Sequence, residues 1–183
     1  MKKWIIPIGI VIVIGVVLMS GYNSLVTVNE DVNGKWSQVE NQLQRRADLI
    51  PNLVETVKGY AAQETEVFTA LANARAALAG AGTVSETEEA NQELTSALGR
   101  LIAIAEAYPE LKSNTNFLAL QDELAGTENR IATARMDYNE AVQSFNTKVK
   151  SLPTALYAGL LGFDEREYFE AEDGAEDGVD VKF

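Results

Sequence analysis

The sequence predicts an all-α protein in which an N-terminal transmembrane helix is followed by a long antiparallel helical bundle of three to four coiled-coil-like helices. Three observations support this fold class. The chain begins with an uncharged apolar run, apolar residues then recur at spacings of three and four, and no alternating strand pattern occurs before the C-terminal tail. Helices joined by short connections fold back antiparallel and bury their apolar stripes against one another.

The N-terminal run, "MKKWIIPIGIVIVIGVVLMSG", is long enough to cross a bilayer as a helix. Trp4 to Ser20 carry no charge, and these residues would measure about 26 Å as a helix, near the short limit for a span. Residues 21–28 are also uncharged and can extend the helix. The run therefore predicts a single-pass membrane protein.

A cleaved signal peptide is the competing interpretation of this run. Its cleavage site would need small residues at the −3 and −1 positions, but bulky Leu18 and Met19 stand directly before Ser20 and Gly21. A lipoprotein is excluded because the chain has no cysteine to acylate. We therefore expect residues 1–24 to form an uncleaved anchor.

Charges on the two sides of the anchor predict its orientation. Lys2 and Lys3 precede the apolar run, whereas Glu30 and Asp31 are the first charged residues after it. Because positive charges favour the cytoplasmic side, this pattern predicts a cytoplasmic N-terminus and an extracytoplasmic body at the bacterial plasma membrane.

The region after the anchor predicts one long helix that passes through Pro51, inside the stretch "RRADLIPNLV". A proline within a helix removes a hydrogen bond and clashes with the preceding turn, at about 3 kcal/mol. The heptad phase nevertheless does not change at this proline, so we expect a single kinked helix from about residue 25 to residue 79. Its seam, with charged members at Arg46 and Glu64, comprises Val32, Trp36, Val39, Leu43, Ile50, Leu53, Val57, Tyr60, Val67, Leu71, Ala74 and Leu78.

Two further helices are predicted after the glycines of "LAGAGTVSETEE". A capping box formed by Ser85 and Glu88 would begin a helix over about 86–107, which Pro109 ends. A third helix is expected over about 114–151, with Pro153 as its stop. The stripe of the first is Leu94, Leu98, Leu101, Ala105 and Tyr108, and that of the second is Phe117, Leu120, Leu124, Thr127, Ile131, Ala134, Tyr138, Ala141, Phe145, Lys148 and Leu152.

The C-terminal part differs in composition from the bundle. The apolar segment "TALYAGLLGFDEREYF" contains Gly159 and Gly162, which weaken it as a helix and predict a docking or interfacial segment. Residues 164–183 contain nine acidic and two basic side chains, more than half of the net charge of −12. We therefore expect an anchor over 1–24, a helical bundle over 25–163 and an acidic, solvated tail over 164–183.

Composition also restricts the function. The chain has no histidine and no cysteine, which excludes the usual zinc sites, thiol nucleophiles and Ser-His-Asp triads. Its acidity excludes nucleic acid as a partner, because nucleic-acid binding needs a basic surface. We expect no metal, no cofactor and no catalytic residue.

Polar residues gather around the proline and along the third helix. We expect them to form an inter-helix network that fixes the register of the two long helices, as polar seam residues do in coiled coils. A polar binding site for a peptide, a lipid headgroup or a small anion is the alternative. The predicted network comprises Arg45, Arg46, Asp48, Pro51, Asn52, Glu128, Asn129, Arg130, Arg135, Tyr138 and Asn139.

Three blocks of the chain closely resemble the LemA family of bacterial proteins. They are "YNSLVTVNEDVNGKWSQVENQLQRRADLIPNLVETVKGYAAQE", "YPELKSNTNFLALQDELAGTENRIATARMDYNEAVQSFN" and "GLLGFDEREYFEAEDG" with the closing "VDVKF". The resemblance implies one N-terminal membrane segment followed by a helical bundle, with no established molecular function. It also implies a cytoplasmic body, opposite to the orientation that Lys2 and Lys3 predict.

The leading functional hypothesis is a non-enzymatic, membrane-anchored scaffold of the cell envelope that forms homo-oligomers through its bundle. The alternative is an adaptor that binds a membrane enzyme or envelope partner through the apolar C-terminal segment. A hydrolase using Asp48, Asp137 and Glu128 ranks last, because no paired acids form a recognisable cleft pattern.

Overall fold

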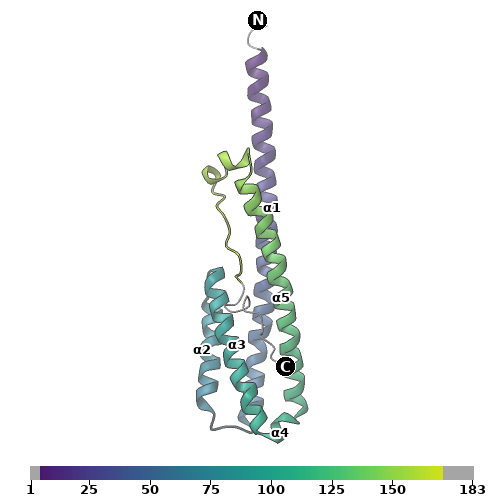
Figure 1. The fold of residues 1–183 in the computed structure, drawn as a ribbon, viewed down its shortest axis with the longest axis vertical. Coiled ribbons are helices and arrows are strands. Elements are labelled where there is room, and N and C mark those ends of the chain that lie inside the picture. The colour runs from purple at the N-terminus through teal and green to yellow at the C-terminus, as the bar shows by residue number, and fades with distance from the viewer. Residues whose placement is uncertain (1–4, 171–183) are drawn as a thin grey trace, which may run out of the picture.

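A computed structural model describes residues 5–170, and these residues form helices and turns without a strand (Figure 1). The prediction of an all-α fold, with an apolar N-terminal helix leading into a bundle, is confirmed. The elements in order are α1 (Ile5–Lys58), α2 (Thr65–Gly80), α3 (Val84–Ala107), the single turn α4 (Pro109–Lys112), α5 (Thr115–Lys150) and the 3-10 turns η2 (Thr154–Leu156) and η3 (Gly159–Leu161).

The helices form two antiparallel pairs. α1 packs along α5, and α2 packs against α3, while α2 touches α1 only lightly. Figure 1 shows α2 and α3 beside the C-terminal half of α1, and the N-terminal part of α1 projecting alone beyond the bundle. The shape therefore separates a bare helix from a bundled body.

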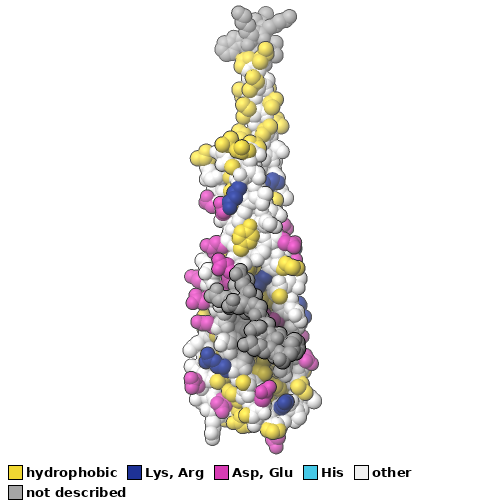
Figure 2. Space-filling model, in the orientation of Figure 1, with side chains coloured by type: hydrophobic (Ala, Val, Ile, Leu, Met, Phe, Trp, Pro, Cys, Tyr) yellow, Lys and Arg dark blue, Asp and Glu magenta, His cyan; other side chains and the backbone are white. Residues whose placement is uncertain are grey.

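The bare part of α1 exposes apolar side chains all round, including Ile6, Val11, Val13 and Met19. Figure 2 shows one face of this apolar surface. A helix that is apolar all round and lies outside a protein core is typical of a membrane span. Among the described residues, α1 alone is long and apolar enough to cross a membrane by length and composition. The apolar N-terminal part of α1 continues into the bundle without a break.

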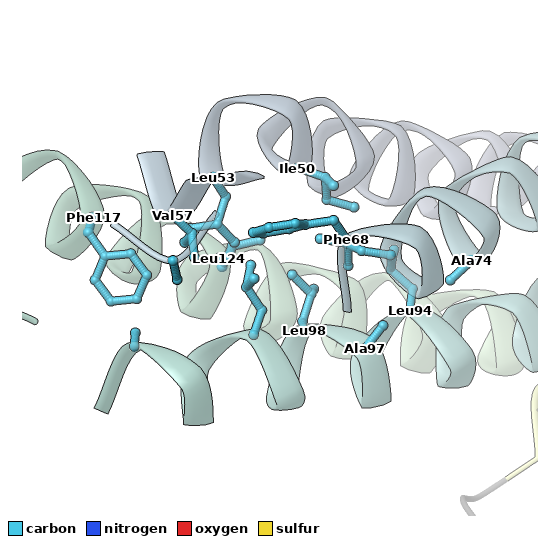
Figure 3. Packing of buried hydrophobic residues seen from close by; sticks show 14 of the residues in the cluster. Ile50, Leu53, Val57, Phe68, Ala74, Leu94, Ala97, Leu98, Phe117 and Leu124 are labelled. Atoms are coloured by element: carbon cyan, nitrogen blue, oxygen red, sulfur yellow. The ribbon is translucent and has the colours of Figure 1, made fainter. Parts of the chain in front are cut away.

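The buried side chains form two hydrophobic clusters along α1. The first joins Leu25, Val32, Val39 and Leu43 to α5 residues that include Phe145. The second lies around the end of α1 and brings all the helices of the body together (Figure 3). Its members include Ile50, Leu53, Val57, Phe68, Leu71, Leu94, Leu98, Leu101, Leu111, Phe117 and Leu124.

The predicted helix over 25–79 is wrong in its second half. α1 ends at Lys58, and the amides of Tyr60 and Ala61 both donate to the Val57 carbonyl, which turns the chain back. α2 then begins with Glu64 at its N-cap, so Glu64 is not a charged seam residue. The heptad rhythm continued across the turn because α2 has an apolar stripe of its own that happens to keep the phase.

Pro51 lies inside α1, so the prediction that this stretch is helix rather than loop is confirmed. Proline has no amide hydrogen, and the carbonyl four residues earlier, at Ala47, therefore loses its helical partner. Arg75 of α2 replaces that partner, since its Nε donates to the Ala47 oxygen at 3.1 Å. Pro51 thus leaves the Ala47 carbonyl of α1 available to accept a hydrogen bond from α2.

The capping box lies two residues earlier than the predicted Ser85–Glu88 pair. Thr83 is the N-cap of α3, and its hydroxyl accepts from the Glu86 amide at 3.2 Å. The Glu86 carboxylate accepts from the amides of Gly82 at 2.8 Å and Thr83 at 3.1 Å, and these bonds lower the pKa of Glu86. Both S/T-x-x-E pairs fit the sequence pattern, but the Thr83 pair satisfies one more amide.

The predicted third helix over 114–151 is confirmed as α5, with Asn114 as its N-cap. The chain beyond it forms η2 and η3 beside α1, and Gly162 closes η3 with a φ of 80°, a left-handed conformation that favours glycine. Residues 163–170 then run back along the bundle as an extended segment, which we call the strap. Residues 164–170 of the predicted acidic tail over 164–183 therefore lie in the strap, where Phe169 is buried rather than solvated. Residues 171–183 lie outside the described residues, as do Lys2 and Lys3.

The contact between Arg75 and Ala47 predicts a specific coupling with Pro51. Arg75→Met should lower the free energy of unfolding by about 1 kcal/mol, because it leaves a part-buried carbonyl without its donor. In a Pro51→Ala background the same change should cost less, since the restored amide of residue 51 bonds to Ala47. Urea unfolding of the four variants measures this cycle.

The exposed Arg100→Met serves as the matched control on α3. Equal costs of Arg75→Met with and without Pro51 would show that Arg75 acts only through its general packing or charge.

Candidate functional site

A buried arginine lies where the two hydrophobic clusters meet. Arg46 is 5% exposed on α1, and its Nη1 lies 2.7 Å from Glu128 Oε2 of α5 and donates to Asn91 Oδ1 of α3 at 3.1 Å. Three helices therefore meet at one guanidinium. A buried charge is stable only when it is paired and hydrogen-bonded, so this polar junction strongly restricts how the helices pack.

A second ionic group lies on the surface beside the junction. Glu123 Oε1 accepts from Arg45 Nε at 3.0 Å and Nη2 at 2.6 Å, and from Arg130 Nη2 at 2.9 Å. The hydrogen bonds from Arg45 are the main reason that the pKa of Glu123 lies below its usual value, and Arg130 adds to the effect. This group joins α1 to α5 on the solvent side of the buried pair.

The light contact between α1 and α2 leaves an open groove of about 630 Å³. Apolar side chains line it, among them Leu43, Ile50, Val54 and Phe68, and Pro51 lies in its α1 wall. Its charged lining residues are Glu40, Glu55, Lys58 and Arg75. The lining of the groove suits the binding of an apolar helix or peptide rather than acid–base chemistry.

The strap is held on α5 by two asparagines seven residues apart. Asn139 Nδ2 donates to the Phe169 carbonyl at 3.0 Å, and Asn139 Oδ1 accepts from the Phe169 amide at 2.9 Å. Asn146 makes the same pair of bonds with Arg166, at 2.9 Å to its carbonyl and 2.8 Å from its amide. Each side-chain amide thus replaces one rung of a β-ladder.

Aromatic contacts fix the end of the strap. The Phe169 ring stacks on Trp36 of α1 with centroids 5.7 Å apart and meets the Tyr138 ring edge-on at 5.4 Å. The Arg135 guanidinium lies 5.0 Å from the centre of the Phe169 ring. Tyr138 donates its hydroxyl to the Glu167 carbonyl at 3.0 Å, and burial raises the pKa of Tyr138.

Comparison with known families shows the family to which the chain belongs. A family model described as LemA family matches residues 35–183 of the chain. This chain belongs to the LemA family. The resemblance inferred from the three sequence blocks is therefore confirmed.

The chain is also similar to three curated proteins. The chain is 31% identical to two proteins named Magnetosome protein MamQ 1 and Magnetosome protein MamQ 2 of Paramagnetospirillum magneticum, over 84% of this chain and 66% of each relative. It is 29% identical to Magnetosome protein MamQ of Magnetospirillum gryphiswaldense, over 83% of this chain and 65% of that relative. The LemA chain thus spans slightly less than two thirds of the length of these relatives.

The structure divides the predicted LemA network into three separate places. Arg46 and Glu128 meet in the buried junction, and Arg45 and Arg130 meet on the surface through Glu123. Arg135, Tyr138 and Asn139 lie under the strap instead. Among the remaining members, Asp48 accepts from Gln44 at 2.8 Å and lies 4.0 Å from Arg75 of α2. The backbone carbonyls of Asn52 and Asn129 accept from Thr56 and Thr133, and Pro51 lines the groove.

Four residues that the sequence interpretation did not assign complete these places. Asn91 joins the junction from α3, Glu123 bridges the two surface arginines, Arg75 bonds to the Ala47 carbonyl, and Asn146 holds the strap. The seven-residue spacing of Asn139 and Asn146 on the seam helix was a signal for the last of these. Asn91 and Arg75 had no signal, because their role depends on where α2 and α3 fold back.

The buried junction predicts a difference between two adjacent arginines. Arg46→Met should lower the free energy of unfolding by about 2 kcal/mol, less than for a fully buried pair because the Glu128 side chain is 47% exposed. Arg45→Met, the matched control, should change it by less than about 0.5 kcal/mol because its pair is exposed. Thermal and urea unfolding measure both; equal effects would contradict a special role for the junction.

The bonds from Asn139 and Asn146 to the strap predict slow hydrogen exchange of the Phe169 and Arg166 amides. Asn139→Ala and Asn146→Ala should each speed hydrogen exchange of the Phe169 or Arg166 amide by about tenfold, which corresponds to about 1.4 kcal/mol of lost bonding. Exchange measured by NMR on the detergent-solubilised chain tests this. The exposed Asn129→Ala is the control, and an unchanged exchange rate in the Asn139 and Asn146 variants would show that the strap does not depend on the rungs.

Proposed function

We propose that this LemA-family protein is a non-enzymatic scaffold, anchored in the bacterial plasma membrane, that self-associates through the groove between α1 and α2. The observation that carries the proposal is the groove itself, an open hollow of about 630 Å³ that is lined mainly by apolar side chains. Apolar hollows of this kind on a helical bundle are typical binding surfaces for another helix.

The occupant that fits the groove best is a second copy of the chain. Ala72, Ala76 and Ala79 line the α2 side, and such small side chains allow a second helix to approach closely. The charged lining residues carry both signs, with Glu40 and Glu55 against Lys58 and Arg75. A two-fold pairing brings the same surface from each copy together, so a surface that carries both charges is complementary to itself.

The absence of an enzymatic role is supported by residue chemistry. Without histidine or cysteine, a catalytic site would depend on carboxylates, lysine, tyrosine or hydroxyl groups. Among residues 5–170, no cluster of three or more acidic side chains is placed to hold a metal ion. The relatives, moreover, are named as magnetosome proteins, a name for a component of a cellular structure rather than for a reaction.

The proposed topology is a single pass with the body outside the cytoplasm, on the basis of Lys2 and Lys3 before the apolar run. The division into an anchor over 1–24, a bundle over 25–163 and an acidic tail over 164–183 belongs to the same proposal.

The adaptor hypothesis rests on a different surface. Leu152, Leu156 and Leu160 of the apolar C-terminal segment are strongly exposed and available to a partner in the envelope. They lie beside the apolar part of α1, however, so lipid competes with a protein for the same side chains. We therefore rank the adaptor second.

Engineered cysteines test self-association, because the natural chain has none that would interfere. Ala76→Cys lies in the groove and should form a disulfide-linked dimer in membranes on mild oxidation. Ala76→Arg should weaken the native dimer at least about tenfold, or about 1.4 kcal/mol, because its bulk and charge fill the groove. Native mass spectrometry in mild detergent measures this second effect.

Ala132, exposed on α5 outside the groove, provides the matched controls Ala132→Cys and Ala132→Arg. A strictly monomeric chain at all concentrations would contradict the scaffold proposal. In intact cells, labelling of Ala132→Cys by a membrane-impermeant maleimide should report an extracytoplasmic body, and protection from the reagent would reverse the topology.

A further inference from the structure

A group of exposed leucines lies beside α1 at the base of its apolar part. Leu152, Leu156 and Leu160 are 77%, 73% and 88% exposed, and Leu161 is also exposed. All four belong to residues 152–162, the segment that contains η2 and η3, which we call the collar. Figure 2 shows the apolar surface of the collar close to that of the projecting helix.

The collar is fixed against α1 at a defined height. The Tyr157 hydroxyl lies directly against Gly21, where any side chain larger than hydrogen would collide with the ring. Just beyond the collar, the rings of Tyr22 and Phe163 meet edge-on with centroids 5.9 Å apart. These contacts place the exposed leucines at the level of residues 21–22 of α1.

A bilayer core of ordinary thickness reaches the level of residues 21–22 of α1. A hydrocarbon core of about 30 Å requires about 20 residues of helix, which from Ile5 extends to about Ser24. The strongly apolar run ends at Ser20, so the membrane must either thin or reach past Gly21. If it reaches past Gly21, the leucines of the collar lie within the same leaflet as the end of the span.

The charges next to the collar follow the order that a membrane surface requires. Lys148 donates to the hydroxyl of Ser24, and Lys150 pairs with Glu165 at 2.7 Å. Arg166 reaches Asn29 Oδ1 at 3.0 Å. Passing along α1 from the span toward the body, the collar leucines come first, and charged side chains of both signs follow, among them Lys148, Lys150 and Glu165, at the level where polar headgroups would lie.

We propose that the collar is a lipid-binding element that enters the acyl boundary of the leaflet from which α1 leaves for the body. The collar and α1 would then hold the bundle by two contacts with one membrane. A single helix allows the body to tilt and rotate, whereas a second inserted element, fixed to α1 through Tyr157 and Gly21, restricts both movements. The proposal rests on α1 crossing the membrane and goes beyond it by assigning lipid to the leucines.

Site-directed spin labelling tests the proposal on the full-length chain, since single cysteines can be introduced without removing any. Leu160→Cys carries the label, and the chain is placed in nanodiscs of phosphatidylethanolamine and phosphatidylglycerol. Accessibility to oxygen, which is enriched in lipid, is compared with accessibility to a water-soluble nickel chelate. We expect the oxygen-to-nickel ratio at Leu160 to exceed severalfold the ratio at Met136→Cys, an exposed position on α5 far from the span.

Val13→Cys, in the middle of the apolar run, separates failure of the collar from failure of the anchor. A lipid-like ratio at Val13 with a water-like ratio at Leu160 would overturn the collar while keeping the span. Water-like ratios at both would overturn both. Low accessibility of Leu160 to both reagents would show that a protein surface covers it, and this result would also overturn the lipid assignment. Gly21→Ala should reduce the ratio at Leu160 and leave Val13 unchanged, because it displaces Tyr157.

Discussion

The body of this protein depends on the burial of one charge, the guanidinium of Arg46. Two hydrophobic clusters are arranged along α1, and the arginine lies between them, paired with Glu128 and bonded to Asn91. A buried polar residue among apolar seam positions specifies the register in which helices pack. An arginine that is buried without its partners is costly, so the arrangement with all three helices in register is preferred.

Pro51 also restricts how helices pack on α1, but it does so by removing a hydrogen-bond donor rather than by adding one. Arg46 brings a donor that must be satisfied, whereas Pro51 removes a donor and leaves the Ala47 carbonyl to be satisfied by Arg75. The buried guanidinium of Arg46 thus positions α3 and α5, and the Ala47 carbonyl positions α2. Both requirements arise within one and a half turns of α1, and the groove proposed for self-association opens at the same place.

The success and the errors of sequence interpretation have physical causes. Long heptad stripes predicted α5 and the passage of α1 through Pro51, because periodic burial is strong over many turns. The turn at Gly59 was missed because the stripe of α2 continues the phase of α1 by coincidence. The seam position of Arg46 predicted a polar contact between helices, but the contacts of Asn91, Arg75 and the strap depend on how distant segments fold back, which periodicity does not encode.

The two asparagine rungs have a mechanical consequence. Seven residues of helix advance about 10.5 Å, and three residues of extended chain advance about 10 Å, so the two spacings are commensurate. A slip of the strap along α5 would therefore break both rungs at once, because the rungs are equally far apart on the two elements. A pull on the C-terminal end along the bundle would load both rungs together in shear, instead of opening them one after the other.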